Sequence, residues 1–417
     1  MLIVLTVLLI ASVGVQAQAD TIRVLAGTGG LGRATSVAVD RFQEETGIKV
    51  DLIQLPSTEV REKQLLELST GSTSLDVVIA DDKVWLVELY RFMEPLEPWI
   101  EKSGYDLSQN IEAMVNLFRW IDPTTGNEAL YGLPFRIGGR VLIYRKDLIP
   151  NPPRTFGELL EIAKAITEEH PGTTYGYVAA MSQHTHMIAD WLPFLRGFGG
   201  DIMSADLTKV IFNSPEGIAG TQFFVDLYRK YKVVPPGAVT YISDSTILAM
   251  QQGLAAMTIN FSPYVDEMND PEKSKFAGNF AIAPFLPYAE GSGLNNGIST
   301  ISGWGFGISK FSRNKELAWK FVQFMASEET QKYVAINSAN APTAKAVFTD
   351  EQYLAKAPFA DAILKVFAYG KCRPASLHWA EIEDILAAEI SAALAGKKTV
   401  EKALADAETR ALQIIGN

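Results

Sequence analysis

The chain has 417 residues, with 37 Lys and Arg against 48 Asp and Glu, which gives a formal net charge of −11 at pH 7. This acidic balance argues against nucleic acids and anionic membrane surfaces as partners. Because Cys372 is the single cysteine, the chain cannot form an intrachain disulfide.

The first 19 residues predict export. Residues 2–15 are almost unbroken apolar sequence, and residues 17–19 (AQA) form an A-x-A cleavage signal. This pattern indicates a secretory signal peptide cleaved after Ala19, and the run is too short for a membrane span. No Lys or Arg precedes it, and a short membrane anchor is the alternative. An exported, acidic chain with one cysteine suits a bacterial periplasm.

Strand-like apolar runs alternate with helical patterns along the chain. In the N-terminal part the order is strand, helix, strand, helix, strand, at residues 21–26, 34–46, 48–55, 61–71 and 75–80. This order predicts an α/β fold with a parallel, helix-covered sheet. Later runs predict strands at 139–148 and 255–261 and helices at 217–231, 314–327 and from 381 onward. The length allows two domains, and without a linker we expect the chain to cross between them more than once.

A glycine-rich stretch, VLAGTGGLGR, follows the first predicted strand. Gly27, Gly29 and Gly32 form G-x-G-x-x-G, and Asp51 lies 24 residues after Gly27, as in a dinucleotide-binding fingerprint. Asp51 lies in the middle of a strand instead of at its end, and an exported chain lacks access to such cofactors, so an oxidoreductase is disfavoured. A tight turn, or a helix N-terminus whose amides hold hydroxyls or an anion, remains open.

The stretch at residues 131–156, YGLPFRIGGRVLIYRKDLIPNPPRTF, resembles the solute-binding proteins of ABC sugar importers, the class of the maltodextrin-binding proteins. The shared pattern is a G-x-P turn, an apolar strand, Y-x-K-D-L and P-P-x-T-F at a helix start. Further blocks occur in the same order, and the resemblance covers the mature chain. These blocks are RFQEETGIKV, LDVVIADD, FLRGFGGDI, GLAAMTINFSPY, ISGWGFGISKFSRNKELAWKFVQFMASEETQ, KCRPASLHWAEIEDIL and GKKTVEKALADAETRAL.

The resemblance implies a two-lobe type II periplasmic binding protein fold, with two α/β lobes, a ligand cleft between them and closure by a hinge. It places the crossings near residues 135–139, 260–264 and 310–315. Lobe 1 would then comprise 20–134 plus 264–310, and lobe 2 would comprise 139–260 plus 315–417. The implied partners are a small carbohydrate or sugar derivative and the membrane permease subunits of an ABC transporter, and the implied state is a monomer. The glycine loop follows the first strand, so we expect it to line the cleft.

A sugar site needs aromatic platforms and polar partners for hydroxyls. Trp304 in a predicted loop, Trp191 and Trp379 are the candidate platforms, each with core packing as the alternative. Asp81 and Asp82 follow the third strand, where one can cap a helix and the other bind. The full set of ligand-binding candidates is Thr28, Gly29, Gly30, Arg33, Asp81, Asp82, Arg136, Gly138, His184, Trp191, Gly199, Asn260, Tyr264, Gly303, Trp304, Arg373 and Trp379.

The charged residues expected near the cleft differ from those of the maltodextrin binders. Gly138 stands where they have an acidic residue, and Gly29 and Gly30 stand where they have charged ones. The region gains guanidiniums from Arg33, Arg136, Arg140 and Arg373. Because arginine suits carboxylate, phosphate and sulfonate groups, an anionic sugar derivative is one hypothesis for the solute. A neutral sugar, with arginines paired to structural acids, is the other.

A periplasmic glycoside hydrolase is the alternative class of protein. It would need two carboxylates about 5–10 Å apart across the cleft, and no acidic residue is predicted opposite Asp81 and Asp82. No G-x-S-x-G or H-E-x-x-H motif occurs. The pair His184 and His186 does not share a face, so no metal site is predicted. We therefore predict a binding protein without catalytic activity, metal or cofactor.

Overall fold

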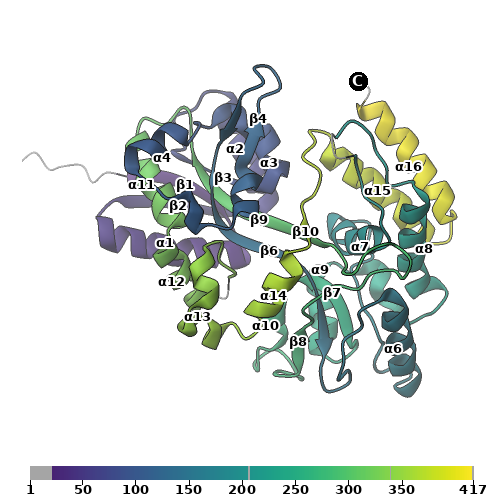
Figure 1. Ribbon diagram of the computed structural model, residues 1–417. Coiled ribbons are helices and arrows are strands. Elements are labelled where there is room, and N and C mark those ends of the chain that lie inside the picture. Colours follow the sequence, from purple (N-terminus) through teal and green to yellow (C-terminus); the bar gives the residue numbers. More distant parts are fainter. Residues whose placement is uncertain (1–20, 205–206, 339, 416–417) are drawn as a thin grey trace, which may run out of the picture.

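Two long antiparallel strands, β6 (Leu133–Arg145) and β9 (Ser299–Ile308), run from one half of the molecule into the other (Figure 1). The computed structural model describes residues 21–204, 207–338 and 340–415. The predicted signal peptide at residues 1–19 lies outside the described residues. The strands connect in the order β2-β1-β3-β9-β6-β7, so a single curled sheet passes through both lobes.

The N-terminal lobe is built on the strand and helix order expected from the sequence. Strand β1 pairs in parallel with β2 and β3, and β3 pairs antiparallel with β9. Val24, Val78 and Phe306 of these strands are fully buried beneath the helices. The elements are β1 (Thr21–Gly27), α1 (Gly29–Thr46), β2 (Lys49–Leu55), α2 (Ser57–Ser69), β3 (Val77–Asp81), α3 (Asp82–Leu89), α4 (Glu97–Ser103), α5 (Glu112–Val115), β4 (Arg119–Ile121), β5 (Glu128–Leu130), α11 (Lys315–Ala326) and α12 (Glu328–Ser338).

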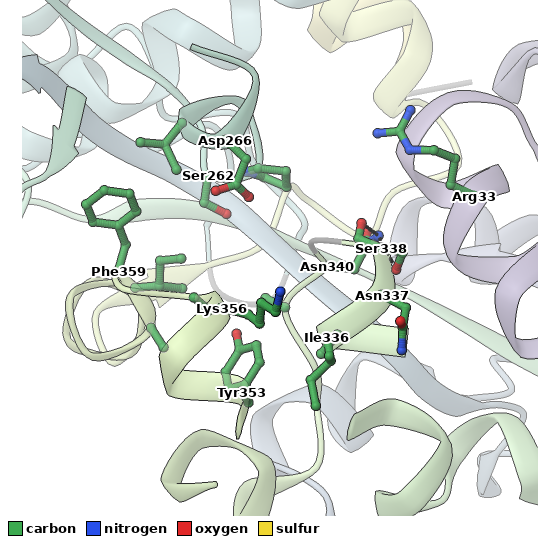
Figure 2. A pocket seen from close by; sticks show the side chains of 17 residues that line it. Arg33, Ser262, Asp266, Ile336, Asn337, Ser338, Asn340, Tyr353, Lys356 and Phe359 are labelled. Carbon is green, nitrogen blue, oxygen red and sulfur yellow. Dashed lines mark hydrogen bonds between the residues drawn. The ribbon is translucent and has the colours of Figure 1, made fainter. Parts of the chain in front are cut away.

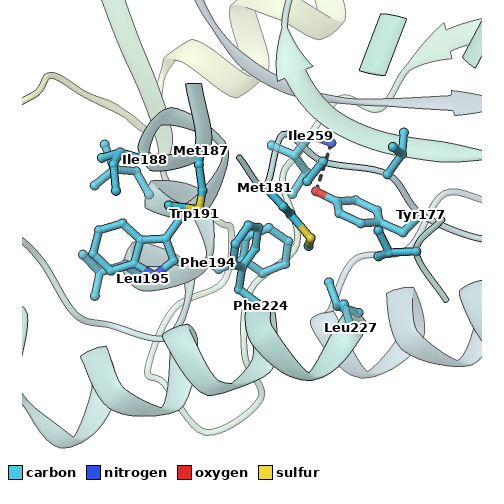
Figure 3. Close-up of a cluster of buried hydrophobic side chains, with 14 of the residues drawn as sticks. Tyr177, Met181, Met187, Ile188, Trp191, Phe194, Leu195, Phe224, Leu227 and Ile259 are labelled. Carbon is cyan, nitrogen blue, oxygen red and sulfur yellow. Dashed lines mark hydrogen bonds between the residues drawn. The ribbon is translucent and has the colours of Figure 1, made fainter. Parts of the chain in front are cut away.

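The C-terminal lobe packs around the second half of β6. This half of β6 pairs with β7 and β8, and helices cover the sheet, with Tyr177, Phe194 and Phe224 among the buried side chains (Figure 3). Thr155 and Glu158 form a capping box that fixes the start of the first helix. The elements are α6 (Phe156–Glu169), α7 (Thr185–Gly197), α8 (Pro215–Arg229), α9 (Ser243–Gln251), β7 (Met257–Phe261), α10 (Tyr264–Met268), β8 (Phe280–Ile282), α15 (Trp379–Leu394) and α16 (Val400–Ile415).

The resemblance implies three crossings between the lobes, and the structure places two of them at other points of the chain. Residues 135–139 lie within β6, just before its pairing changes from β9 to β7. Residues 260–264 stay in the C-terminal lobe, because β7 and β8 both pair with β6 and Val265 and Met268 join that core. The second crossing is β9. Residues 310–315 lie within the N-terminal lobe, whose core includes the buried side chains of α11.

The third crossing is a helical connection. After α12 the chain passes through α13 (Glu351–Lys356) and α14 (Ala360–Phe367) to the short strand β10 (Gly370–Lys371), which pairs with the start of β9. It then enters α15 of the C-terminal lobe. The N-terminal lobe thus comprises roughly the segments before β6 and from β9 to α12, and the predicted boundaries at 264–310 and 315–417 are corrected accordingly.

Gly138 lies in β6 where the two lobes meet, and its backbone approaches an aromatic ring closely. A Cβ atom at this position would lie 2.1 Å from Cζ of Phe261 on β7. We predict that Gly138→Ala lowers the free energy of unfolding by about 1–3 kcal/mol, the usual cost of overpacking. Urea denaturation followed by circular dichroism measures this change.

The matched control is Gly157→Ala in the first turn of α6. Gly157 is exposed, and its Cβ would meet only the Thr155 hydroxyl at 3.6 Å. Because alanine favours a helix over glycine, this variant should be neutral or more stable by up to about 1 kcal/mol. Equal destabilisation by both variants would contradict the close approach at Gly138.

Candidate functional site

Three polar or aromatic side chains from neighbouring strands meet at the boundary between the lobes. Asp81 at the end of β3 is the register partner of Trp304 on β9, and Trp304 is also the partner of Arg136 on β6. Directly opposed residues on paired strands project to the same face of a sheet. The carboxyl end of β3 therefore places Asp81, Trp304 and Arg136 side by side.

Asp81 pairs with an arginine that the third crossing delivers. Nη2 of Arg373 donates to Oδ2 of Asp81 at 2.8 Å, and this pair is largely buried. Oδ1 of Asp81 is buried without a hydrogen-bond partner among the described residues. Burial raises the pKa of Asp81, although the guanidiniums of Arg373 and Arg136 oppose this shift. One carboxylate oxygen is thus left available at the boundary.

Arg196 of α7 fixes the backbone that carries Arg373. Its buried guanidinium donates to the carbonyl oxygens of Lys371 at 2.8 Å and Cys372 at 2.7 Å, and it pairs with Asp201 at 3.1 Å. Such charge-assisted bonds order an otherwise irregular segment. Arg196 therefore attaches the segment that leads into α15 to the C-terminal lobe.

The first turn of α15 adds two buried groups, Trp379 and Glu383. Trp379 is 1 % exposed and packs in the core of the C-terminal lobe, so the core-packing alternative to the predicted platform holds for it; its indole Nε1 has no hydrogen-bond partner among the described residues. Burial raises the pKa of Glu383 to about 7, Arg373 lowers it, and Asp384 and Asp81 raise it further. These two residues lie four positions apart, on one face of the helix.

Arg136 is the least compensated charge at the boundary. It is 5 % exposed, its Nε has no hydrogen-bond partner, and no carboxylate of the described residues forms an ion pair with it. Burial lowers the pKa of Arg136 to about 10, while Asp81 and Tyr264 raise it and Arg33 lowers it. Its Cζ lies 5.9 Å from the centre of the Phe261 ring, which supplies a weak cation–π contact.

The glycine loop shapes the N-terminus of α1. Gly29 has φ +68°, which favours glycine, and a Cβ on Gly32 would lie 2.5 Å from the carbonyl oxygen of Gly27. The N-cap residue Thr28 makes no side-chain capping bond, and the first turn carries no acidic residue. A groove of about 380 Å³ runs beside this turn between Thr28, Arg33 and the end of α12.

Two cavities are lined by residues of both lobes. The first, of about 470 Å³, has Arg33 on one side and Ser262 and Asp266 on the other, with Tyr353 and Lys356 of α13 below (Figure 2). Burial, together with Glu267, raises the pKa of Asp266 to about 6. The second, of about 330 Å³, lies between α5 and the segment at residues 371–375.

Three of the predicted ligand contacts have structural partners in this fold instead. Trp191 is fully buried in the C-terminal core, where its Nε1 donates to Thr221 at 3.0 Å (Figure 3). Asn260 is fully buried and accepts from Arg140 at 2.6 Å. Gly138 faces Phe261, as described above. These three positions serve packing. Gly199 follows the end of α7, where it is exposed and has φ +96°, and its contact with a ligand stays a prediction.

Arg140 and His184 also have structural partners. Arg140 pairs with the buried Asp190 at 3.3 Å, and burial raises the pKa of Asp190 to about 6 although Arg140 lowers it. The alternative in which an arginine pairs with a structural acid therefore holds for Arg140. His184 is exposed and caps α7 by accepting from the backbone N–H of His186 at 3.1 Å. Within the described residues, no group of three or more His, Cys, Asp or Glu is arranged to hold a metal.

The remaining candidates lie at or near the boundary. Trp304 is half-buried and packs edge-on against Trp85 at 4.9 Å, and it belongs to β9 and not to a loop. Gly303 is buried in the same strand, where a Cβ would lie 2.9 Å from Leu117. Tyr264 begins α10 and is close enough to Arg136 to raise its pKa. Asp82 begins α3, and its side chain lies outside the described residues.

Sequence reasoning missed Glu383 and Arg196. Glu383 carried a signal, because it lies four residues after the candidate Trp379 in a predicted helix. No pattern in the sequence pointed to Arg196, since its partners Lys371 and Cys372 lie 175 and 176 residues away. None of the helices in the described part of the chain has the length and apolar character needed to cross a membrane.

The fold and the boundary site together define a two-lobe, periplasmic-binding-protein type of ligand-binding protein. The maltose-bound protein MalE3 of T. maritima is 30 % identical, with a TM-score of 0.83 over 95 % of this chain and 100 % of that one. A solute-binding protein from Thermotoga lettingae bound to α-D-tagatose is 25 % identical, with a TM-score of 0.80 over 95 % and 100 %. These likenesses confirm the predicted fold.

The model of the bacterial extracellular solute-binding protein family matches residues 27–332, so the chain belongs to this family. The resemblance found in the sequence is thereby confirmed. A probable amino-acid ABC transporter periplasmic-binding protein of Sinorhizobium fredii is 22 % identical over 92 % of this chain and 87 % of its own length. A putative binding protein of Brucella abortus is 23 % identical over 89 % and 87 %.

The raised pKa of Glu383 predicts how stability depends on pH. The folded-state pKa of about 7 lies above the unfolded value, so the folded protein loses stability as pH rises from about 4.5 through 7. Glu383→Gln does not titrate. We expect the variant to gain up to about 3 kcal/mol over the wild type between pH 4.5 and pH 8, measured by urea denaturation.

The exposed Glu381 in the same turn supplies the matched control, Glu381→Gln. Its unfolding free energy should follow the wild-type curve against pH. Parallel curves for the wild type and Glu383→Gln would contradict the burial of a titrating carboxyl at this position.

Proposed function

We propose that the protein is the solute-binding component of an ABC importer. It binds a carbohydrate or sugar derivative between its lobes and delivers it to the membrane permease subunits. The observation that carries this proposal is the boundary site itself, where Asp81, Arg136 and Arg373 meet between two lobes that, in the described part of the chain, are joined by two strands and one helical connection. Such a connection permits closure by rotation of one lobe against the other.

The solute class follows from the site and from the relatives. The 30 % identical protein of T. maritima is bound to maltose, and the 25 % identical protein of Thermotoga lettingae is bound to α-D-tagatose. Trp304 presents a half-buried indole beside the polar groups Asp81 and Arg373, a combination that suits the flat apolar face and the hydroxyls of a sugar ring. Trp304 is thus the aromatic platform in this proposal.

The role is binding without turnover. A glycosidase needs two carboxylates at about 5–10 Å, one as acid and one as base or nucleophile. Asp81 is paired with Arg373, and Asp81 is close enough to Glu383 of the opposite lobe to raise the pKa of Glu383. Arg373 lowers the pKa of both carboxyl groups, which opposes the protonated form that a general acid needs. Catalysis is tested below together with binding.

The cellular setting is part of the same proposal. A signal peptide cleaved after Ala19 would release the mature chain into the periplasm, where a monomer would meet the permease. N-terminal sequencing of the exported protein tests the cleavage site, and light scattering tests the monomer.

Binding is tested with the mature protein and a panel of sugars and polyols. A solute that binds the folded state raises the melting temperature in proportion to RT ln(1 + [L]/Kd). Calorimetry should then give a 1:1 stoichiometry, and mass spectrometry should recover the solute unchanged. Hydrolysis of the sugar, or a panel of sugars, polyols and their acid forms without a single binder, would contradict the proposal.

Trp304→Ala tests the aromatic platform. We expect the affinity for the identified solute to fall at least about tenfold, because an aromatic contact with its buried area contributes more than about 1.4 kcal/mol. Trp99→Ala is the matched control, since Trp99 is also half-buried against a second tryptophan, Trp319, away from the boundary. Calorimetry should give wild-type affinity for the control, and equal losses in both variants would contradict the assignment.

A further inference from the structure

We propose that the solute carries an anionic group, a carboxylate, phosphate or sulfonate, which binds at the N-terminus of α1 between the guanidiniums of Arg33 and Arg136. This inference rests on the proposed function, because it assigns the chemical class of the solute and the place where its charge is held. Three independent features of the described residues converge on this place.

The first feature is the open N-terminus of α1. This helix has 18 residues, and neither a side-chain cap nor an acidic residue occupies its first turn. The leading N–H groups of a helix lack partners within it and carry partial positive charge, so they attract anions. The glycines of the loop leave this backbone accessible, since a Cβ on Gly29 would meet no atom within 4 Å.

The second feature is Arg136, a buried guanidinium with no ion pair. Its Nε lacks a hydrogen-bond partner, and its side chain is 95 % removed from solvent. Asp81 raises the pKa of Arg136, yet its Oδ2 is bonded to Arg373, its Oδ1 makes no hydrogen bond, and neither oxygen forms an ion pair with Arg136 among the described residues. Burying a charge without a partner costs free energy, so this arrangement fits a site completed by a ligand's negative charge.

The third feature is the convergence of Arg33 and Arg136 on one point. The position of a Cβ on Gly30 lies 3.8 Å from Nη2 of Arg33 and 3.9 Å from Nη1 of Arg136. Arg33 is exposed and forms no ion pair among the described residues, and its charge lowers the pKa of Arg136. Two cations that repel each other beside a helix N-terminus share one favourable partner, an oxyanion that both can contact.

The neighbouring groups favour an anion beside the N-terminus of α1 over one beside Arg373. The carbonyl oxygen of Gly30 accepts from Nδ2 of Asn340 at 3.3 Å, so this acceptor already has a donor. Asp81 and Glu383 lie toward Arg373, where they would accept hydroxyl protons or repel a second negative charge. The geometry therefore favours a solute with one terminal anionic group and a polar, uncharged remainder.

The first experiment uses inorganic phosphate and sulfate as probes. At constant ionic strength, each should raise the melting temperature of the mature protein saturably and above the effect of chloride. The Arg136→Gln and Arg33→Gln variants should lose this response. Arg313→Gln should keep the rise in melting temperature, because Arg313 is exposed and follows the C-terminal end of β9. No effect above chloride in the wild type, or an unchanged response in both variants, would overturn the proposal.

The second experiment compares matched pairs by calorimetry, D-galactose with D-galacturonate and glycerol with glycerol 3-phosphate. The charged member of at least one pair should bind at least tenfold more tightly than its neutral partner, and Arg136→Gln should erase the difference. Phosphate that binds more tightly than every organic acid would identify the solute as a free oxyanion held by the same groups. Tight binding of only neutral members would overturn this inference and leave the proposed function intact.

The ligand-free stability of the variant supplies a readout independent of any solute. Because Arg136 is buried without an ion pair, Arg136→Gln should melt at a higher temperature than the wild type in chloride buffer. Arg140→Gln, which removes a paired guanidinium and leaves Asp190 buried, should melt lower. A destabilised Arg136→Gln would show that Arg136 is a structural cation and would overturn the proposal.

Discussion

The strands β6 and β9 belong to both lobes, and the geometry of the boundary site depends on their register. Arg136 lies opposite Trp304 on these strands, and Asp81 of β3 lies opposite the same tryptophan. A shift of one residue would send these side chains to the other face of the sheet. Close packing at Gly138 and Gly139, where a Cβ would lie 2.1 Å from Phe261 and 2.6 Å from Phe367, holds the strands in place. The crossing strands therefore connect the lobes and also position the side chains of the site.

The buried arginines differ in whether a carboxylate pairs with them, although the residue type is the same. Arg140 and Arg196 each have a carboxylate partner, Asp190 and Asp201, and stabilise the C-terminal lobe. Arg136 has no such partner among the residues that the structure describes, and it lies at the boundary. A buried charge that is left unpaired opposes folding, so its presence where two lobes meet indicates a binding role more than a structural one. This contrast supports the anionic subsite beside α1.

Much of the fold followed from local pattern. The strand predicted at residues 21–26 is β1 (Thr21–Gly27), the helix predicted from residue 34 is part of α1, and the parallel order of β1, β2 and β3 agrees with the βαβ pattern. Trp304 was expected in a loop because glycines flank it. The glycines instead allow β9 to pack closely, since a Cβ on Gly305 would lie 2.6 Å from both the Leu133 carbonyl and Phe118.

The sequence by itself determined the family, the two-lobe α/β class and the glycine loop that opens α1, because these depend on periodicity and on motifs within a few tens of residues. It also brought Arg33, Arg136, Arg140 and Arg373 to attention. Only the tertiary structure decided which of them is paired, because their partners lie far along the chain. Arg373 reaches Asp81 across 292 residues, and Arg140 reaches Asn260 across 120. Long-range pairing of this kind leaves no local pattern, so burial and charge balance at the boundary become visible only once the lobes are assembled.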